Sequence, residues 1–122
     1  MYEDRMALFG KIPGAFDLYM QLEEVICARY PRAEIRPKRS QVGFFDGYGF
    51  AWASPPLRGK AGITVTLGLP ERLSSDRVFA AAEPYPGRWT HHFLVHSSAQ
   101  FDDEFISWLD AAHAFAAVRS RK

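Results

Sequence analysis

The chain has 122 residues, with 15 lysine and arginine residues against 14 aspartate and glutamate residues, for a formal net charge of +1 at pH 7. This length suits one domain, and we expect residues 1–122 to form a single domain that buries roughly two-thirds of the surface of its unfolded chain. Hydrophobic residues make up 48% of the chain, so folding requires no disulfide, metal or cofactor. The near-neutral charge supplies no global field for nucleic acid or anionic lipid, so any such affinity must come from a local patch.

Cysteine usage and hydropathy indicate where the protein works. Cys27 is the only cysteine, so no disulfide can form within the chain and a reducing compartment is expected. The charged residues Glu3, Asp4 and Arg5 precede any apolar run, and no segment approaches the ~20 apolar residues of a membrane span. We therefore expect a soluble, cytoplasmic protein that does not contact a membrane.

The first predicted helix follows Pro13, a residue type that fits the first position of a helix. Residues then recur at spacings of three and four and form one stripe: Leu18, Leu22, Val25, Ile26 and Arg29. Pro31 disfavours helical geometry in the residue before it, so the helix should end near Tyr30. Residues 1–12 show a weaker pattern, which allows a short helical turn.

A tight antiparallel hairpin is predicted around Asp46-Gly47, a dipeptide suited to a type I′ turn. Its strands are residues 41–45 and 48–54. This turn sets three cross-strand pairs: Phe45 with Tyr48, Gly43 with Phe50, and Gln41 with Trp52. The large aromatic side chains then share one face: Phe45, Tyr48, Phe50 and Trp52. The other face holds Val42, Phe44, Gly49, Ala51 and Ala53.

Two further strands are predicted downstream of the hairpin. Residues 62–69 alternate aliphatic side chains with threonine and glycine, which is the period of a half-buried strand. Pro70 ends that strand, and residues 70–87, rich in serine, proline and alanine, are predicted to be a connection with at most a turn of helix. Residues 88–96 are predicted to form the fourth strand.

The last predicted element is a helix, which Ser97 or Ser98 could cap. Its apolar residues follow helical spacing: Phe101, Phe105, Trp108, Leu109, Ala112, Phe115 and Ala116. Acidic residues at its start favour the positive end of the helix dipole. The predicted fold class is therefore α+β, with an antiparallel sheet of about four to five strands and an N-terminal and a C-terminal helix packed on it, in the order α-β-β-β-β-α.

Three of the four histidines fall in residues 88–96, which invites a metal-site interpretation. In an extended strand, however, His91 points to one face, whereas His92 and His96 point to the other. His92 and His96 lie ~13 Å apart along such a strand, too far to bind one zinc ion together. We therefore predict no metal and no cofactor, with His91 buried and hydrogen-bonded and His92 solvated.

No catalytic motif accompanies these histidines. The sequence contains no Gly-x-Ser-x-Gly elbow that would expose a nucleophilic serine. Residues 47–51 resemble the core of the RNA-recognition-motif signature, but Asp46 stands where a cation is expected, Ala53 stands where a second aromatic is expected, and the required second helix does not follow. Aromatic side chains on a hairpin face are more often core than stacking surface. We therefore assign no catalytic residue and favour a core role for the hairpin aromatics.

Two groups of cations could form a local binding patch. They are Arg32, Arg36, Lys38 and Arg39 before the hairpin, and Arg119, Arg121 and Lys122 at the end of the sequence. The second group fits the dipole of a helix end and a charged tail. The first group could share a concave sheet with the fourth strand, where it would suit phosphate or carboxylate groups. The candidate binding residues are therefore Arg36, Lys38, Arg39, Arg88, His91 and His92.

The preferred hypothesis is a non-enzymatic binding module for an anionic ligand or an acidic partner, with nucleic acid as one option. One alternative is a small enzyme that uses His91 or His92 as a general acid or base, in a pocket formed with Ser40, Tyr85 and Trp89. Another alternative is a homodimer formed through the edge of the hairpin or through its aromatic face.

Several short motifs occur in an order that is typical of one bacterial family. In chain order they are Tyr2-Glu3-Asp4, Gly10-Lys11-Ile12-Pro13, Arg39-Ser40-Gln41-Val42-Gly43-Phe44, Phe50-Ala51, Leu69-Pro70, Arg77, His91-His92-Phe93 and Trp108-Leu109. Together they resemble the family called domain of unknown function 5655 over nearly the whole chain. Family members tend to carry Lys-Thr in place of Arg39-Ser40 and a basic residue in place of Glu71. The resemblance implies no catalytic or ligand residues, and in outline the family is similar to small α-β-α domains of the YjbR type, which are thought to bind DNA.

Overall fold

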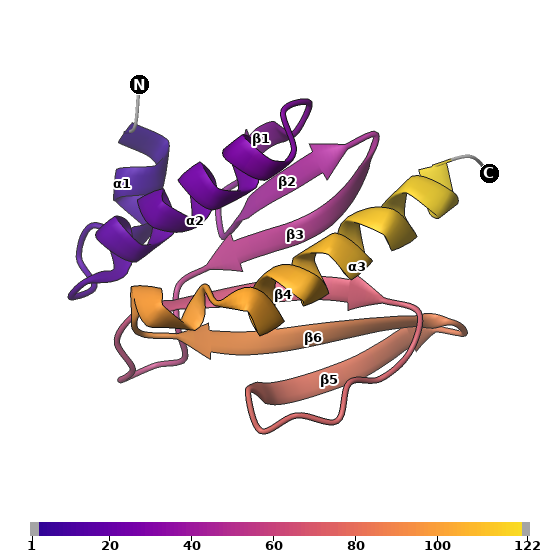
Figure 1. The fold of residues 1–122 in the computed structure, drawn as a ribbon. Coiled ribbons are helices and arrows are strands. Elements are labelled where there is room, and N and C mark those ends of the chain that lie inside the picture. The colour runs from indigo at the N-terminus through magenta and orange to yellow at the C-terminus, as the bar shows by residue number, and fades with distance from the viewer. Residues whose placement is uncertain (1–2, 121–122) are drawn as a thin grey trace.

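The computed structural model describes residues 3–120 and shows an α+β fold built on one six-stranded antiparallel sheet (Figure 1). In chain order the elements are α1 (Glu3–Phe9), α2 (Ala15–Arg29), β1 (Glu34–Pro37), β2 (Val42–Asp46), β3 (Tyr48–Ser54), β4 (Ile63–Leu69), β5 (Val78–Tyr85), β6 (Arg88–Val95), a 3₁₀-helix η1 (Ser98–Gln100) and α3 (Asp103–Ser120). The strands lie side by side in the order β1-β2-β3-β4-β6-β5. The predicted fold class is confirmed, and the sheet has six strands where about four to five were expected. No helix within residues 3–120 has the length and apolar character needed to cross a membrane.

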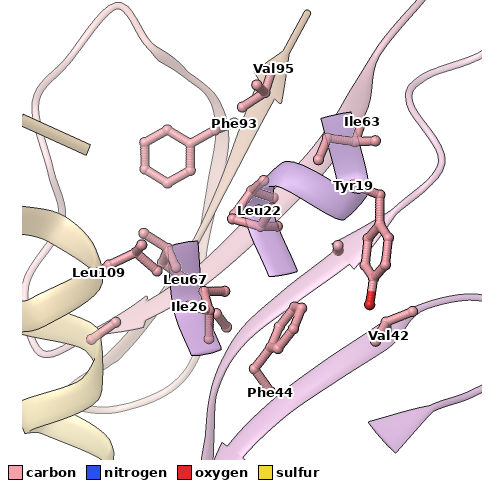
Figure 2. Packing of buried hydrophobic residues seen from close by; sticks show 14 of the residues in the cluster. Tyr19, Leu22, Ile26, Val42, Phe44, Ile63, Leu67, Phe93, Val95 and Leu109 are labelled. Carbon is pink, nitrogen blue, oxygen red and sulfur yellow. The ribbon is translucent and has the colours of Figure 1, made fainter. Parts of the chain in front are cut away.

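Helices α2 and α3 both lie across one face of the sheet (Figure 1), and we call this the covered face. Side chains from both helices meet the inward side chains of the strands, as Figure 2 shows for Leu22 of α2, Leu109 of α3 and Leu67 of β4. Helix α1 packs against α2, where the ring of Phe9 stacks on Tyr19 at 4.8 Å between centroids. We call the opposite side of the sheet, on which none of these three helices lies, the uncovered face.

Helix α2 begins at Ala15, two residues later than the position of Pro13 suggested. Gly14 precedes it with a φ of 72°, a left-handed conformation that glycine adopts without steric cost. Its buried residues follow the predicted spacing: Ala15, Leu18, Tyr19, Leu22 and Ile26. The helix ends at Arg29, close to the predicted end, and α1 is longer than the single turn that the weak pattern of residues 1–12 allowed.

The β2–β3 hairpin forms, but its register differs from the predicted one. The observed pairs are Asp46 with Tyr48, Phe45 with Gly49, Phe44 with Ala51, Gly43 with Trp52 and Val42 with Ala53. Phe50 is therefore an extra residue in β3, and such a β-bulge directs two successive side chains to the same side. Phe50 and Ala51 are accordingly both buried in the core, whereas Phe45 and Trp52 lie on the uncovered face. The prediction that Phe50 shares a face with Phe45 and Trp52 is wrong.

The two edge strands, β1 and β5, were not predicted. β1 pairs only with β2, and β5 pairs only with β6. An edge strand needs one hydrogen-bonded neighbour, so it tolerates proline and charge that a central strand does not. Residues 70–87 were expected to be a connection with at most a turn of helix, and they contain the eight residues of β5 instead.

The connection between β4 and β5 crosses β6, because β6 lies between those two strands in the sheet. Two contacts anchor this connection. The Leu73 N–H donates a hydrogen bond to His91 Nε2 at 2.9 Å. Arg77 donates to Asp102, to Glu104 and to the carbonyl oxygen of Gln100 at 2.6–3.0 Å. The connection is thus fastened to β6 and to the beginning of α3.

The start of α3 is capped by a residue other than the serines that were expected to cap it. Asp102 Oδ1 accepts a hydrogen bond from the Phe105 N–H at 3.0 Å, which satisfies a free donor of the first helical turn. Hydrogen bonding from Arg77 lowers the pKa of Asp102 and keeps it a charged acceptor. Ser97 caps the short η1 instead, through the Ala99 N–H.

Candidate functional site

On the uncovered face, paired residues form one continuous row that crosses all six strands. From one edge to the other, the row consists of Arg36, Gly43, Trp52, Thr66, His92 and Ala80. Neighbouring strands are about 4.8 Å apart, so Arg36 and His92 are about 19 Å apart across the row. Arg88 lies on the same face as His92, because it is four residues earlier in the same strand. Three of the six predicted binding residues therefore share this face.

Arginine and aromatic side chains contact one another along this face. The guanidinium carbon of Arg36 lies 4.1 Å from the centre of the Phe45 ring, and the Phe45 ring meets Trp52 edge to face at 6.4 Å. Arg88 lies over Trp52 at 5.7 Å and over Tyr85 at 5.6 Å. Such cation–π contacts hold each guanidinium group in a restricted set of positions. Arg36 also donates to Glu34 Oε1 at 3.4 Å and Arg88 to the Tyr85 hydroxyl at 3.3 Å, which leaves the other N–H donors of each planar group. We call these five residues the Arg–aromatic cluster.

Glycines lie directly beneath this cluster. A Cβ atom at Gly43 would stand 2.6 Å from Phe45 Cε1, and one at Gly49 would stand 2.6 Å from Trp52 Cζ2. Neither glycine has a positive φ, so no unusual backbone conformation requires glycine here. Glycine is required because the rings leave no space for a Cβ atom. A Cβ at Gly68 would touch the Arg88 guanidinium at 3.4 Å. The absence of side chains here lets the two rings lie close to the strand backbones.

His92 lies at the far side of the row from Arg36. Its Nδ1 is 2.8 Å from Thr66 Oγ1 on the neighbouring strand, and its ring lies 6.0 Å from the ring of Phe79. Burial lowers the pKa of His92 below the ordinary value of 6.5, so the imidazole is neutral at pH 7. The side chain is half-buried, not fully solvated as expected. At neutral pH the positive charges of this face therefore belong to its arginines.

His91 lies on the covered face and is completely buried, as the sequence predicted. Because its Nε2 accepts the hydrogen bond from Leu73, the neutral ring carries its proton on Nδ1. That Nδ1 has no hydrogen-bond partner among the described residues. Burial lowers the pKa of His91 below 6.5. The structure thus separates His91 from the other candidate binding residues and places it under the β4–β5 connection.

Lys38 and Arg39 lie in the exposed turn between β1 and β2, which is closed by a hydrogen bond from the Lys38 N–H to the Gln41 carbonyl at 2.7 Å. They border the sheet beyond Arg36 at the end of β1 and do not join the Arg–aromatic cluster. Arg32, which the sequence placed in the same run, lies 3.6 Å from Asp46 instead. Of the C-terminal cations, Arg121 and Lys122 lie outside residues 3–120, as do Met1 and Tyr2, and the side chain of Arg119 is also outside the described part.

The residues proposed for an enzymatic pocket are not brought together. His91 and Trp89 lie on the covered face, whereas His92 and Tyr85 lie on the other side of the sheet. Ser40 belongs to the β1–β2 turn. Cavities of about 370, 400 and 430 Å³ lie elsewhere: between residues 72–76 and β5, beside the start of α2, and between α2 and residues 98–101. None of these three cavities is lined by a residue of the Arg–aromatic cluster.

A second group of polar residues joins the hairpin tip to α3. His113 Nε2 lies 2.9 Å from Asp46 Oδ2, and its ring stacks on Tyr30 at 4.4 Å. Tyr30 and Arg29 both donate to Asp110, and the hydrogen bonds from Arg29 lower the pKa of Asp110 to about 2. These partners come from β2, from the end of α2 and from α3, so the group joins the hairpin to both helices. Sequence reasoning missed it because these residues are far apart in the chain.

The part of the chain that the structure describes contains no cluster of side chains that could bind a metal ion. Nowhere in residues 3–120 do three or more histidine, cysteine, aspartate or glutamate side chains lie close enough to hold one ion. The paired residues His113 and Asp46 supply only two such groups. The chemistry that the uncovered face offers is therefore that of cations, hydrogen-bond donors and aromatic rings.

Comparison with known proteins places the chain in a family without assigning it an activity. No curated protein and no solved structure matches it. The family model described as Domain of unknown function (DUF5655) matches residues 10–116, which is most of the chain and includes every strand of the sheet. The chain belongs to this DUF5655 family, in agreement with the resemblance of its motifs.

Proposed function

We propose that the protein is a non-enzymatic binding module that takes an anionic ligand on the uncovered face of its sheet. The observation that carries this proposal is the Arg–aromatic cluster, in which Arg36 and Arg88 are held against aromatic rings on a side of the sheet that carries no helix. Arginine presents a planar fork of donors that matches phosphate and carboxylate groups. Side chains held in this way lose less conformational entropy when a ligand binds.

The distribution of acidic residues supports the same proposal. Nine of the 14 acidic residues lie on the three α-helices or directly before α3: Glu3, Asp4, Asp17, Glu23, Glu24, Asp102, Asp103, Glu104 and Asp110. The helices lie on the covered side, so much of the negative charge is on the far side of the sheet from the cluster. Glu34 beside Arg36 is an acidic residue of the uncovered face. The uncovered face thus carries Arg36 and Arg88 against Glu34, which lies 3.4 Å from Arg36, and this balance favours an anion there.

Retention on immobilised heparin, a polyanion, tests this proposal. We expect the protein to be retained at low salt and released as salt rises, because screening and counterion release weaken such contacts. The double variant Arg36→Ala/Arg88→Ala should elute at lower salt than the parent. Arg72→Ala is the matched control, because Arg72 makes a similar cation–π contact with Trp89 at 5.8 Å on the covered side. Passage of the parent protein without retention would refute the proposal.

Self-association is a second candidate function, favoured by the exposed edge strand β5. This strand has a hydrogen-bonded neighbour on one side only, and Phe79 in it is 42% exposed. Unpaired strand edges can pair with a second chain. Sedimentation velocity at several protein concentrations tests this candidate, and a monomer at all of them would exclude it.

For location, we propose a reducing compartment such as the cytoplasm. Cys27 is the only cysteine and is a free, exposed thiol. An exposed thiol persists most readily where cellular reductants prevent oxidation. A tagged copy found in an oxidising compartment would argue against this location.

A further inference from the structure

We infer that the ligand of the uncovered face is single-stranded nucleic acid, with its bases stacked on the Arg–aromatic cluster. This inference rests on the proposed function, because it names the class of anion. The cluster supplies both parts of such a site. The guanidinium planes of Arg36 and Arg88 lie over the Phe45, Trp52 and Tyr85 rings and can themselves carry a stacked base, and their N–H groups are donors for phosphates. Non-specific single-strand sites combine these two features.

The closeness of the rings to the sheet favours stacking. At Gly43 and Gly49 no side chain separates the Phe45 and Trp52 rings from the strand backbones. A base can stack on an aromatic ring or on the plane of an arginine, and Arg36 at 4.1 Å from Phe45 offers such a plane. The row from Arg36 to His92 is about 19 Å long, which corresponds to roughly five to six nucleotides at the ~3.4 Å spacing of a stacked strand.

Charge favours a single strand over a duplex. The net charge of +1 gives little of the phosphate neutralisation on which non-specific duplex binding depends. In a duplex the base faces are stacked on one another and cannot reach Trp52 or Tyr85. A single strand leaves those faces free, so stacking can supply affinity that the small number of cations does not.

An acidic peptide fits the face less well. Carboxylates would satisfy Arg36 and Arg88, but they offer no flat group that could stack on the guanidinium planes and rings of the cluster. Each nucleotide of a nucleic acid strand carries a phosphate and a base, and this face likewise places cations beside rings. We therefore commit to single-stranded nucleic acid and leave a carboxylate polymer as an outcome of the test.

The direct test compares oligonucleotides of about 12 nucleotides, within the usual range of site sizes for single-strand binders. The probes are a fluorescein-labelled single strand, the same strand annealed to its complement, and an abasic strand of equal length that keeps the phosphates but lacks the bases. Fluorescence anisotropy measures each affinity at low salt. We expect the intact strand to bind roughly 5- to 150-fold more tightly than the abasic strand, the ratio given by stacking of one base. It should also bind more tightly than the duplex.

Matched variants locate the binding on one face. Tyr85→Ala should weaken binding of the intact strand roughly 5-fold or more. It should weaken abasic binding less, because the abasic strand loses only the Tyr85 contacts that hold Arg88. Tyr85 is 43% exposed, so this variant should fold, and thermal unfolding checks that it does. Tyr48→Ala is the control, because Tyr48 is similarly exposed at 45% but pairs with Asp46 and belongs to the other face. Trp52→Leu provides a second variant, with Trp89→Leu as its control.

The outcomes separate the inference from the proposed function. Equal binding of intact and abasic strands, or equally tight binding of poly-glutamate, would overturn the inference and leave anion binding intact. Tighter binding of the duplex than of the single strand would also overturn it. No binding of any of these polyanions would overturn both. A loss in Tyr48→Ala that matches the loss in Tyr85→Ala would show that binding does not occur on the uncovered face.

Discussion

Phe44 and Phe45 are neighbours in β2, yet they lie in very different surroundings. Phe44 points to the covered face and is completely buried, whereas Phe45 points to the uncovered face and contacts Arg36 and Trp52. His91 and His92 show the same division in β6. Adjacent side chains in a strand point to opposite faces, so a short run such as Phe-Phe or His-His does not mark a single site. The covered face holds the core of the fold, and the uncovered face is the side on which we propose that a ligand binds.

The largest expected difference between the faces is in stability. Phe44→Ala should lower the free energy of unfolding by about 3–5 kcal/mol, because it leaves a cavity in the core. Phe45→Ala should cost about 1–2 kcal/mol, because its ring is only partly buried and loses a cation–π contact. Urea unfolding of both variants measures the difference. Equal losses would show that the uncovered face is as important to the core as the covered one.

The next effect concerns the glycine beneath Phe45. Gly43→Ala should cost about 1–3 kcal/mol, because the new Cβ would overlap the Phe45 ring at 2.6 Å. In the double variant Gly43→Ala/Phe45→Ala that overlap is removed. Its cost should therefore be smaller than the sum of the single costs by about 0.5 kcal/mol or more. Additive losses in urea unfolding would mean that Gly43 is required for another reason.

The two histidines predict a pH dependence of stability. Burial lowers the pKa of both His91 and His92 below 6.5, so the unfolded chain binds more protons than the folded chain as the pH falls through that range. Their stabilising contribution is complete above about pH 6.5 and is lost on acidification, with a slope of at most about 1.4 kcal/mol per pH unit for each histidine.

Unfolding measured between about pH 7.5 and pH 5.5 tests this expectation. His91→Gln keeps an acceptor for the Leu73 N–H and removes the titrating group, so the pH dependence should become shallower. His96→Gln is the control, because His96 is exposed at the end of β6. An unchanged slope in His91→Gln would contradict the assignment of a buried neutral ring.

Replacement of Arg88, which lies over Trp52, should have the smallest effect on stability. Arg88→Ala should lower stability by only about 0.5–1 kcal/mol, the usual value of an exposed cation–π contact. Its effect on binding should be clearer, because the dependence of log affinity on log salt should fall by about 0.7 for each lost phosphate contact on a single strand. Anisotropy titrations at several salt concentrations measure that slope, with Arg72→Ala as the control. An unchanged slope would remove Arg88 from the site.

Periodicity predicted the parts of the fold that are half-buried. The sequence of β4 alternates aliphatic residues with threonine and glycine, and burial alternates in β6 from His91 to Val95. This alternation placed His91 and His92 on opposite sides correctly. β1 and β5 lie at the edges, where burial does not impose a pattern on the sequence. The bulge at Phe50 was also missed, because a run of Tyr, Phe and Trp separated by small residues reads as regular alternation.

The candidate site could be predicted only in part. The sequence singled out Arg36, Arg88 and His92, but their common face depends on the register between strands that are distant in the chain. Phe45 and Trp52 were expected to be core residues, since an aromatic pair on a hairpin gives no sign of which face is covered. Gly43 and Gly49 were the sequence features that could have indicated this site. Glycine inside a strand often marks a place where another group lies close to the backbone, as the Phe45 and Trp52 rings do here.

The glycines beneath the rings have a consequence for selectivity. Proteins distinguish one base from another by hydrogen bonds to its edge, which require donors and acceptors standing around a recess. Gly43, Gly49 and Gly68 contribute no such walls to the surface. Contact through ring planes is nearly the same for all four bases, since each has a π face. A surface built in this way would accept many sequences, and its choice of target in the cell would depend on where single strands occur.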